Sequence, residues 1–226
     1  MSRQNEWSRY LALMDERPEC FQNTGPIYIV KDWTVIEEYQ QRTGKTIGVC
    51  YESEYNIFVV DLVYEHEGEY FCYERILPAT PKGSVVCVPE YNSQYILLKQ
   101  YRHSMRDYQY AFPRGYAAPE LTGEQNACKE IEEELGAKVT KTRFLGSVVA
   151  DSGLSGQTVE IYVCYVESYQ NHYGYEGIVE TYIASEDELM QMIRNNQITD
   201  GFTLAAYCYL GSEKNDRRYC VTISAI

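Results

Sequence analysis

The chain has 226 residues, 45% of them hydrophobic and 23% charged, and a formal net charge of −13. No stretch approaches the roughly 18 consecutive apolar residues that span a bilayer, and the N-terminal residues lack the small-residue cleavage site of a secretory signal. These features argue against a membrane protein and favour a cytoplasmic one. The acidity argues against nucleic acid as a partner, because like charges repel, but a bound divalent cation can reverse the local field for a small phosphorylated substrate.

The eight cysteines are widely scattered, with no CxxC pair and no histidine at a metal-binding spacing nearby. Free cysteine packs as a small hydrophobic residue. We therefore expect reduced, mostly buried thiols rather than a disulfide framework or a zinc site.

The first part of the chain is helical in pattern. Apolar residues three or four positions apart predict a short amphipathic helix over residues 5–15. A second helix is predicted over residues 33–42, with Asp32 as its N-cap and Gly44 as its stop. We expect these two helices to form an N-terminal appendage over residues 1–46.

From residue 47 the chain changes to short β-rich runs separated by turn residues. The strand-like runs are 47–52, 56–65, 70–79, 83–90, 94–102, 143–150, 158–168 and 178–184. Helical patterns lie between and after them, at 123–135, 185–196 and 202–211. Strands on both sides of one central helix predict an α/β (α+β) sandwich over residues 47–226 rather than a doubly wound parallel sheet.

The central helix carries the densest group of ionisable residues. Thr122 and Gln125 have the spacing of a capping box, and Gly136 suits the left-handed residue just past a helix end. The predicted helix therefore runs from about Gly123 to Leu135. Its apolar residues recur every four positions and form one stripe.

Three carboxylates of this helix, those of Glu130, Glu133 and Glu134, are predicted to share one patch. Like charges one turn apart destabilise a helix, and acidic residues near its C-terminus oppose its dipole. A bound cation would compensate for this cost. Carboxylate oxygens are ligands that suit Mg²⁺ or Mn²⁺, so we expect one of these ions as the cofactor.

The segment 115–137 resembles the Nudix box, G-x5-E-x7-R-E-U-x-E-E-x-G-U, in which U is aliphatic. The matching residues, all in register, are Gly115, Glu130, Ile131, Glu133, Glu134 and Gly136. Two positions depart from the pattern, because Leu121 replaces the first glutamate and Lys129 replaces the arginine. Lysine keeps the positive charge of arginine but not its planar fork.

The flanking segments resemble the ADP-ribose pyrophosphatase branch of that family, and the resemblance covers roughly residues 61–210. Residues 111–115 are similar to its E-L-P-A-G segment, 100–102 to its Q-Y-R, 151–157 to its S-P-G-x-S-x-E loop and 198–206 to its closing helix. The departures from these patterns include Ala111, Ser152 and Gln157.

The resemblance implies a Nudix-type α/β/α sandwich with a mixed central sheet. It also implies a magnesium-dependent pyrophosphohydrolase that cleaves a nucleoside diphosphate linked to another moiety, with ADP-ribose or a nucleotide sugar as the favoured substrate. The departures leave an alternative open, in which the same fold serves as a catalytically weak or inactive module that binds nucleotides or ADP-ribose.

The resemblance also implies roles for individual residues. The metal would be held by Glu130, Glu133, Glu134 and the backbone carbonyl of Arg114, with Glu133 also available as a local base. Substrate would contact Arg102 and Gly115. The expected general base is a loop carboxylate after the box, and the candidates are Glu176, then Glu180, with His103 and His172 possible only by residue type.

Pyrophosphatases of this branch are commonly homodimers, so the resemblance implies a homodimer here. The N-terminal residues Trp7, Tyr10 and Trp33 look exposed in the sequence pattern. They are expected either to join such an interface or to cover the sheet of their own subunit.

Overall fold

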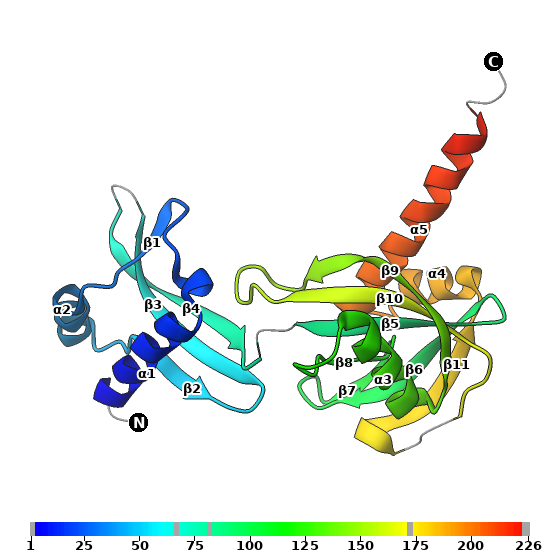
Figure 1. Ribbon diagram of the computed structural model, residues 1–226, viewed down its shortest axis with the longest axis horizontal. Coiled ribbons are helices and arrows are strands. Elements are labelled where there is room, and N and C mark those ends of the chain that lie inside the picture. Colours follow the sequence, from blue (N-terminus) through cyan, green and yellow to red (C-terminus); the bar gives the residue numbers. More distant parts are fainter. Residues whose placement is uncertain (1–2, 66–67, 81–82, 171–173, 223–226) are drawn as a thin grey trace. The chain divides into compact units, whose positions relative to one another are not determined.

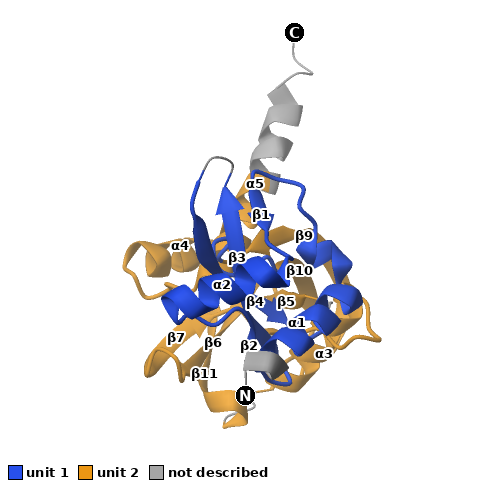
Figure 2. Ribbon diagram, turned by 90° about the vertical axis from the view of Figure 1, so that its left-hand side faces the viewer, with its two compact units in different colours: residues 1–81, 151–157 blue, residues 82–150, 158–226 orange. Residues whose placement is uncertain are grey.

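The computed structural model describes residues 3–65, 68–80, 83–170 and 174–222, and the side chains of 6–212 within these ranges (Figure 1). The chain divides into two compact units, which Figure 2 distinguishes by colour. Unit 1 comprises residues 1–81 and 151–157, and unit 2 comprises residues 82–150 and 158–226. No helix in the described ranges is long and apolar enough to cross a membrane.

Unit 1 is built on a four-stranded antiparallel sheet with β3 at its centre. Strands β1 and β2 pair with opposite ends of one edge of β3, and β4 pairs along the other edge. The elements are α1 (Arg3–Glu16), the 3-10 helix η1 (Pro18–Phe21), β1 (Ile27–Ile29), α2 (Trp33–Thr43), β2 (Gly48–Glu52), β3 (Asn56–Glu65) and β4 (Tyr70–Pro78).

The two faces of the β3 sheet are covered by different helices. Ile57 and Val59 point into a core that includes side chains of α1, whereas Val60 and Leu62 point into a second core that includes side chains of α2. This follows from the alternation of side chains along a strand. Tyr10 is fully buried in the first of these cores, so the expectation that it is exposed was wrong.

A buried ion pair lies within the α1-facing core. The carboxylate of Asp61 is 2% exposed and accepts a hydrogen bond from Arg75 Nε at 2.5 Å. The hydroxyl of Tyr10 donates to the same carboxylate. Arg75 also donates to the carbonyl of Cys20 at 2.7 Å, so these contacts join α1, η1, β3 and β4.

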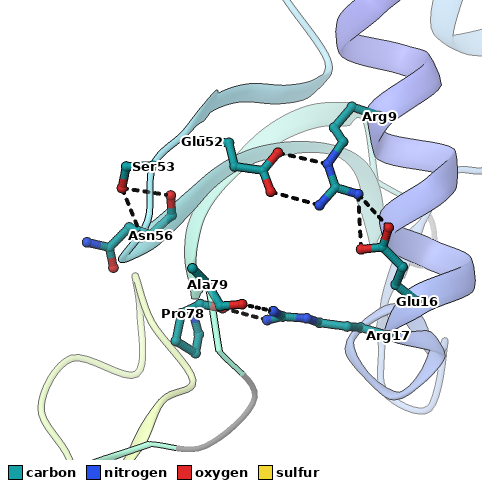
Figure 3. A network of polar contacts seen from close by, with 8 residues as sticks. All are labelled: Arg9, Glu16, Arg17, Glu52, Ser53, Asn56, Pro78 and Ala79. Carbon is teal, nitrogen blue, oxygen red and sulfur yellow. Dashed lines mark hydrogen bonds and ion pairs between the residues drawn. The ribbon is translucent and has the colours of Figure 1, made fainter. Parts of the chain in front are cut away.

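A second polar network fastens α1 to the sheet at the surface (Figure 3). Arg9 donates to both carboxylate oxygens of Glu52 on β2, at 2.8 Å each, and also to Glu16 on its own helix. Arg17, just after α1, donates to the carbonyl of Pro78 at 2.5 Å. These contacts connect α1 with β2 and with the end of β4.

The division after Pro81 differs from the boundary expected between residues 46 and 47. Strands β2 to β4 were expected to belong with the central helix, but among the described residues they pair only with each other and with β1. The segment 151–157 is assigned to unit 1 and is hydrogen-bonded to β4. The amide of Ile76 donates to the carbonyl of Leu154 at 2.8 Å, and the Tyr73 hydroxyl donates to that of Gly153 at 2.9 Å.

Unit 2 contains a seven-stranded mixed sheet, in which β5 and β10 are parallel and the other pairs are antiparallel. The strand order is β11-β6-β5-β10-β9, with β7 paired to β6 and β8 paired to β5. The strands are β5 (Ser84–Tyr91), β6 (Gln94–Arg102), β7 (Asp107–Ala111), β8 (Arg114–Tyr116), β9 (Val139–Val149), β10 (Thr158–Val166) and β11 (Ile178–Ala184). The helices are α3 (Gly123–Leu135), the 3-10 helix η2 (Tyr175–Gly177), α4 (Glu186–Arg194) and α5 (Gly201–Thr222).

Helices cover both faces of this sheet. On β5, Val85 and Cys87 point toward the core beneath α3, whereas Val86 and Val88 point toward the core beneath α4 and α5. Unit 2 is therefore a three-layer α/β/α sandwich. The short strands β7 and β8 were not predicted from the sequence. Strand β7 pairs with β6, and β8 lies beside α3.

Candidate functional site

Helix α3 begins and ends where the sequence predicts. The Thr122 hydroxyl accepts a hydrogen bond from the Gln125 amide, and the Gln125 side chain accepts one from the Thr122 amide, which completes the capping box. Gly136 has φ 55°, the left-handed conformation that ends many helices. Ala127, Ile131 and Leu135 are fully buried against the sheet, and this packing orients the helix.

The three glutamates of α3 lie in different environments. Glu134 is only 2% exposed and Glu130 only 7%, whereas the side chain of Glu133 is 39% exposed. Glu130 and Glu134 are one turn apart on the face next to the buried stripe. They are the two carboxylates that the fold places inside the protein.

Strand β8 lies directly against these two carboxylates. A Cβ atom at Gly115 would lie 2.0 Å from Glu130 Oε2, so only glycine lets the carboxylate occupy this place. The backbone amide of Arg114 donates to Glu134 Oε2 at 3.2 Å. The backbone of residues 114–115 therefore borders the carboxylate pair.

The electrostatic environment of the pair disfavours negative charge. Burial, together with the carboxylates of Glu130 and Glu176, raises the pKa of Glu134 to about 8. Burial also raises the pKa of Glu130. Two buried acids that resist ionisation are characteristic of sites where a bound cation or a proton supplies the missing charge.

Lys129 supplies part of that positive charge. Its ammonium group lies 3.3 Å from Glu130 Oε1 and 2.8 Å from Glu133 Oε2. Lysine thus takes up the position that arginine has in the Nudix box and pairs with two of the three glutamates. Glu133 is turned toward this ammonium group.

The donor set fits a metal ion in part. Within the described ranges, no three histidine, cysteine, aspartate or glutamate side chains lie close enough together to enclose a metal ion. The buried pair of Glu130 and Glu134, bordered by the Arg114 backbone, matches Mg²⁺, which typically takes one or two carboxylates and fills its other positions with water and substrate oxygens. A cation there would also relieve the cost of burying two carboxylates.

Two arginines are linked electrostatically to this pair, since the charge of Arg102 acts on Glu134 and that of Arg114 acts on Arg102. Arg102, at the end of β6, has a buried Nε atom without a hydrogen-bond partner among the described residues. Arg114 Nη1 contacts Asp200 Oδ1 at 2.9 Å, and its guanidinium carbon lies 5.0 Å from the centre of the Phe202 ring. Burial lowers the pKa of Arg102, and the charge of Arg114 lowers it further.

Asp200 and the side chain of Arg114 were not predicted as site residues. Asp200 caps α5, because its carboxylate accepts hydrogen bonds from the amide of Thr203 at 2.9 Å and from its hydroxyl at 2.8 Å. An aspartate just before a helical pattern is a recognisable capping signal in the sequence. Its contact with Arg114, however, joins residues 86 positions apart in the sequence, and no short sequence pattern predicts such a contact.

Glu176 lies close enough to the buried pair to influence it. Its charge contributes to the raised pKa of both Glu130 and Glu134. The side chain is exposed, and Gln100 Nε2 donates to its backbone carbonyl at 2.9 Å. Glu176 has φ 45°, which is uncommon for a residue other than glycine and is found at strained functional positions.

The other expected bases have other surroundings. Glu180 lies 3.6 Å from Lys99 and accepts a hydrogen bond from the Tyr110 hydroxyl, which is a structural role. His103 is exposed in the turn after β6, 3.1 Å from Arg106. His172 lies outside the described residues.

Residues that depart from the resembled patterns lie in different parts of the structure. Leu121 lies just before α3 and lines a hollow with Thr122, Asn126 and Glu160. Ser152 and Gln157 belong to the segment assigned to unit 1.

Comparison with known proteins identifies the fold. No family model matches the chain, and no curated protein matches its sequence. Among solved structures, 351 chains are similar. One of them, described as an ADP compounds hydrolase, has a TM-score of 0.65 and 18% sequence identity, over 75% of this chain and 91% of that chain. This likeness confirms the fold class that the sequence predicts, a Nudix-type α/β/α sandwich with a mixed central sheet.

Proposed function

We propose that the protein is a magnesium-dependent pyrophosphohydrolase that cleaves a nucleoside diphosphate linked to another moiety. The observation that carries this proposal is the buried pair of Glu130 and Glu134, with the charge of Arg102 acting on Glu134 and that of Arg114 acting on Arg102. A metal–diphosphate complex is bound by carboxylates, which hold the cation, and by guanidinium groups, which hold the phosphates.

The residues of the chain divide the work in the following way. Glu130 and Glu134, with the Arg114 carbonyl, would hold the metal, and Glu133 would join them by leaving Lys129. A magnesium ion bound there would lower the pKa of an attacking water and neutralise charge on the phosphate. Arg102 would bind and orient the phosphates, and the close approach of Gly115 keeps Glu130 in place.

Glu176 is the general base that we propose. It is an exposed carboxylate near the buried pair, its carbonyl is fixed by Gln100, and its backbone is held in an uncommon conformation. A base at the rim of the site can take a proton from water and release it to solvent.

The substrate class follows from the same chemistry and from the structural likeness. The neighbour is described as a hydrolase of ADP compounds. We propose ADP-ribose or a nucleotide sugar as the substrate, since either presents a diphosphate between two organic groups.

The test is hydrolysis of a panel that contains ADP-ribose, nucleotide sugars, dinucleotides and nucleoside triphosphates, with magnesium or manganese. We expect phosphomonoester products from at least one diphosphate-linked substrate. Glu134→Gln should abolish turnover, whereas Glu132→Gln, at an exposed carboxylate of the same helix, should leave it unchanged. If no member of the panel is cleaved, the catalytic proposal is wrong.

A second candidate is a module that binds such a ligand without cleaving it. It is favoured by the ion pairs that Lys129 forms with both Glu130 and Glu133, because they engage two of the three expected metal ligands. Titration calorimetry separates the two candidates. Tight binding of ADP-ribose without turnover would support the binding module.

A further inference from the structure

Arg114 adds a positive charge that the resembling sequence pattern lacks. Residues 111–115 are similar to an E-L-P-A-G segment, in which alanine stands where this chain has Arg114. The side chain is therefore a feature of this protein rather than of the pattern. It begins on β8, next to the residue that packs against Glu130.

The guanidinium of Arg114 is held in place by the start of α5. Asp200, which is 5% exposed, contacts Arg114 Nη1 at 2.9 Å and receives two hydrogen bonds from Thr203. The Thr203 hydroxyl in turn accepts a hydrogen bond from the amide of Phe112 at 3.0 Å. Because each partner is itself bonded, the guanidinium is preorganised, and Phe202 supports its face.

The charge of the anchored guanidinium acts on a second guanidinium, that of Arg102. Arg102 Nε is buried without a hydrogen bond in the described part of the chain, and Arg114 is the charge that most strongly opposes its protonated form. Asp200 accepts a hydrogen bond from Nη1 of Arg114, and the other nitrogens of that guanidinium have no hydrogen-bond partner among the described residues. Two guanidinium groups that interact in this way repel each other, and an anion bound to both would offset that repulsion.

We propose that Arg102 and Arg114 together form a clamp for the diphosphate of the substrate, with Asp200 as the positioning residue of Arg114. This inference rests on the proposed function, because it assigns phosphate contacts within the same site. Arginine presents its N–H groups in a planar fork that matches two phosphate oxygens. Arg114 is thus a substrate-binding residue through its side chain, in addition to the role proposed for its carbonyl.

The test uses the full chain and inorganic pyrophosphate as the probe, measured by titration calorimetry in buffer with magnesium. We expect Arg114→Gln to weaken pyrophosphate binding by about 10- to 100-fold, the range for the loss of a hydrogen-bonded charge contact. Arg114→Lys should recover part of that loss, because it keeps the charge but not the fork. The matched control is Arg194→Gln, at an exposed arginine at the end of α4, which should bind as the wild type does.

The clamp is overturned if Arg114→Gln binds pyrophosphate as tightly as the wild type, or if the wild type does not bind it. Thermal melting of each variant checks folding. If Arg114→Gln does not fold, Arg114→Lys decides, and unaltered affinity in that variant contradicts the planar-fork contact. Hydrolysis of the substrate panel is scored separately. If Arg114→Gln binds pyrophosphate more weakly and the wild type hydrolyses no member of the panel, the clamp is supported and the catalytic proposal is rejected.

Discussion

The acidic residues at the end of α3 differ in their surroundings although they are adjacent in sequence. Glu134 is enclosed beneath β8, whereas Glu133 faces outward and pairs with Lys129. The cost of enclosing Glu134 is visible in its raised pKa. A buried acid with a strongly shifted pKa is typical of a functional site, where a ligand can compensate its charge.

The raised pKa of Glu134 predicts a pH dependence of stability in the metal-free protein. Folded Glu134 keeps its proton up to about pH 8, while the unfolded chain releases it near the ordinary value for glutamate, 4.5. Because the folded state binds more protons over this interval, stability should fall as pH rises from about 4.5 to 8 and change little from this group above that. Melting temperatures in chelator should show this fall in the wild type.

Glu134→Gln should lose this part of the pH dependence, since glutamine does not titrate. Glu132→Gln is the matched control and should keep the wild-type curve. Parallel curves for the wild type and Glu134→Gln would contradict the assignment.

Gly115 is predicted to be required for function more than for folding. In Gly115→Ala the new methyl group would meet the carboxylate of Glu130, which is the movable end of a side chain. We expect a stability loss of about 1–3 kcal/mol, typical of overpacking, but a loss of magnesium affinity and turnover because Glu130 is displaced. Urea unfolding and magnesium titration measure the two effects.

Gly211→Ala is the control for this substitution, because its added methyl group meets no atom within 4 Å. It should leave magnesium affinity unchanged. Unaltered turnover in Gly115→Ala would show that Glu130 does not need its present position.

At the scale of elements, two ion pairs of unit 1 differ in burial and therefore in the effect expected on the free energy of unfolding when they are broken. Asp61 occurs in the middle of the apolar run of β3, and the alternation of that strand points it into the core beneath α1. Arg75 and Tyr10 compensate its charge there. The pair of Arg9 and Glu52 links α1 to the same sheet at the surface (Figure 3).

These two pairs predict different costs of substitution. Asp61→Asn leaves Arg75 buried with an incomplete partner and should lower the free energy of unfolding by about 3–5 kcal/mol. Glu52→Gln, in the partly exposed pair, should lower it by about 1 kcal/mol or less. Urea denaturation of both variants gives the comparison. Similar losses for the two would contradict the role of burial.

At the scale of the whole molecule, the N-terminal helices belong to a unit with its own sheet. Helices α1 and α2 cover the two faces of β2 to β4, and their side chains Tyr10, Leu13 and Ile36 have no exposed surface. Of the two roles expected for this segment, covering its own sheet is the one that these contacts support. The homodimer stays a prediction, to be checked by light scattering for twice the chain mass of 26.2 kDa.

Removal of residues 1–45 is therefore predicted to damage folding. The deletion takes away both helices and leaves both apolar faces of the remaining strands uncovered, which favours association. We expect aggregation in light scattering and increased binding of a hydrophobic dye relative to the full chain. A truncated protein that is monodisperse and melts as the full chain does would show that the sheet does not depend on these helices.

The sequence by itself determined the features that depend on near neighbours. The bounds and caps of α3, the caps of α2, the alternation of the strands and the adjacency of Glu130 and Glu134 all follow from spacings of one to four residues. Only the tertiary structure decided which carboxylates are enclosed, that Asp200 holds Arg114, and that β2 to β4 form a separate sheet. The physical reason is that these features depend on contacts between segments distant in the chain, whose packing and pairing no local pattern records.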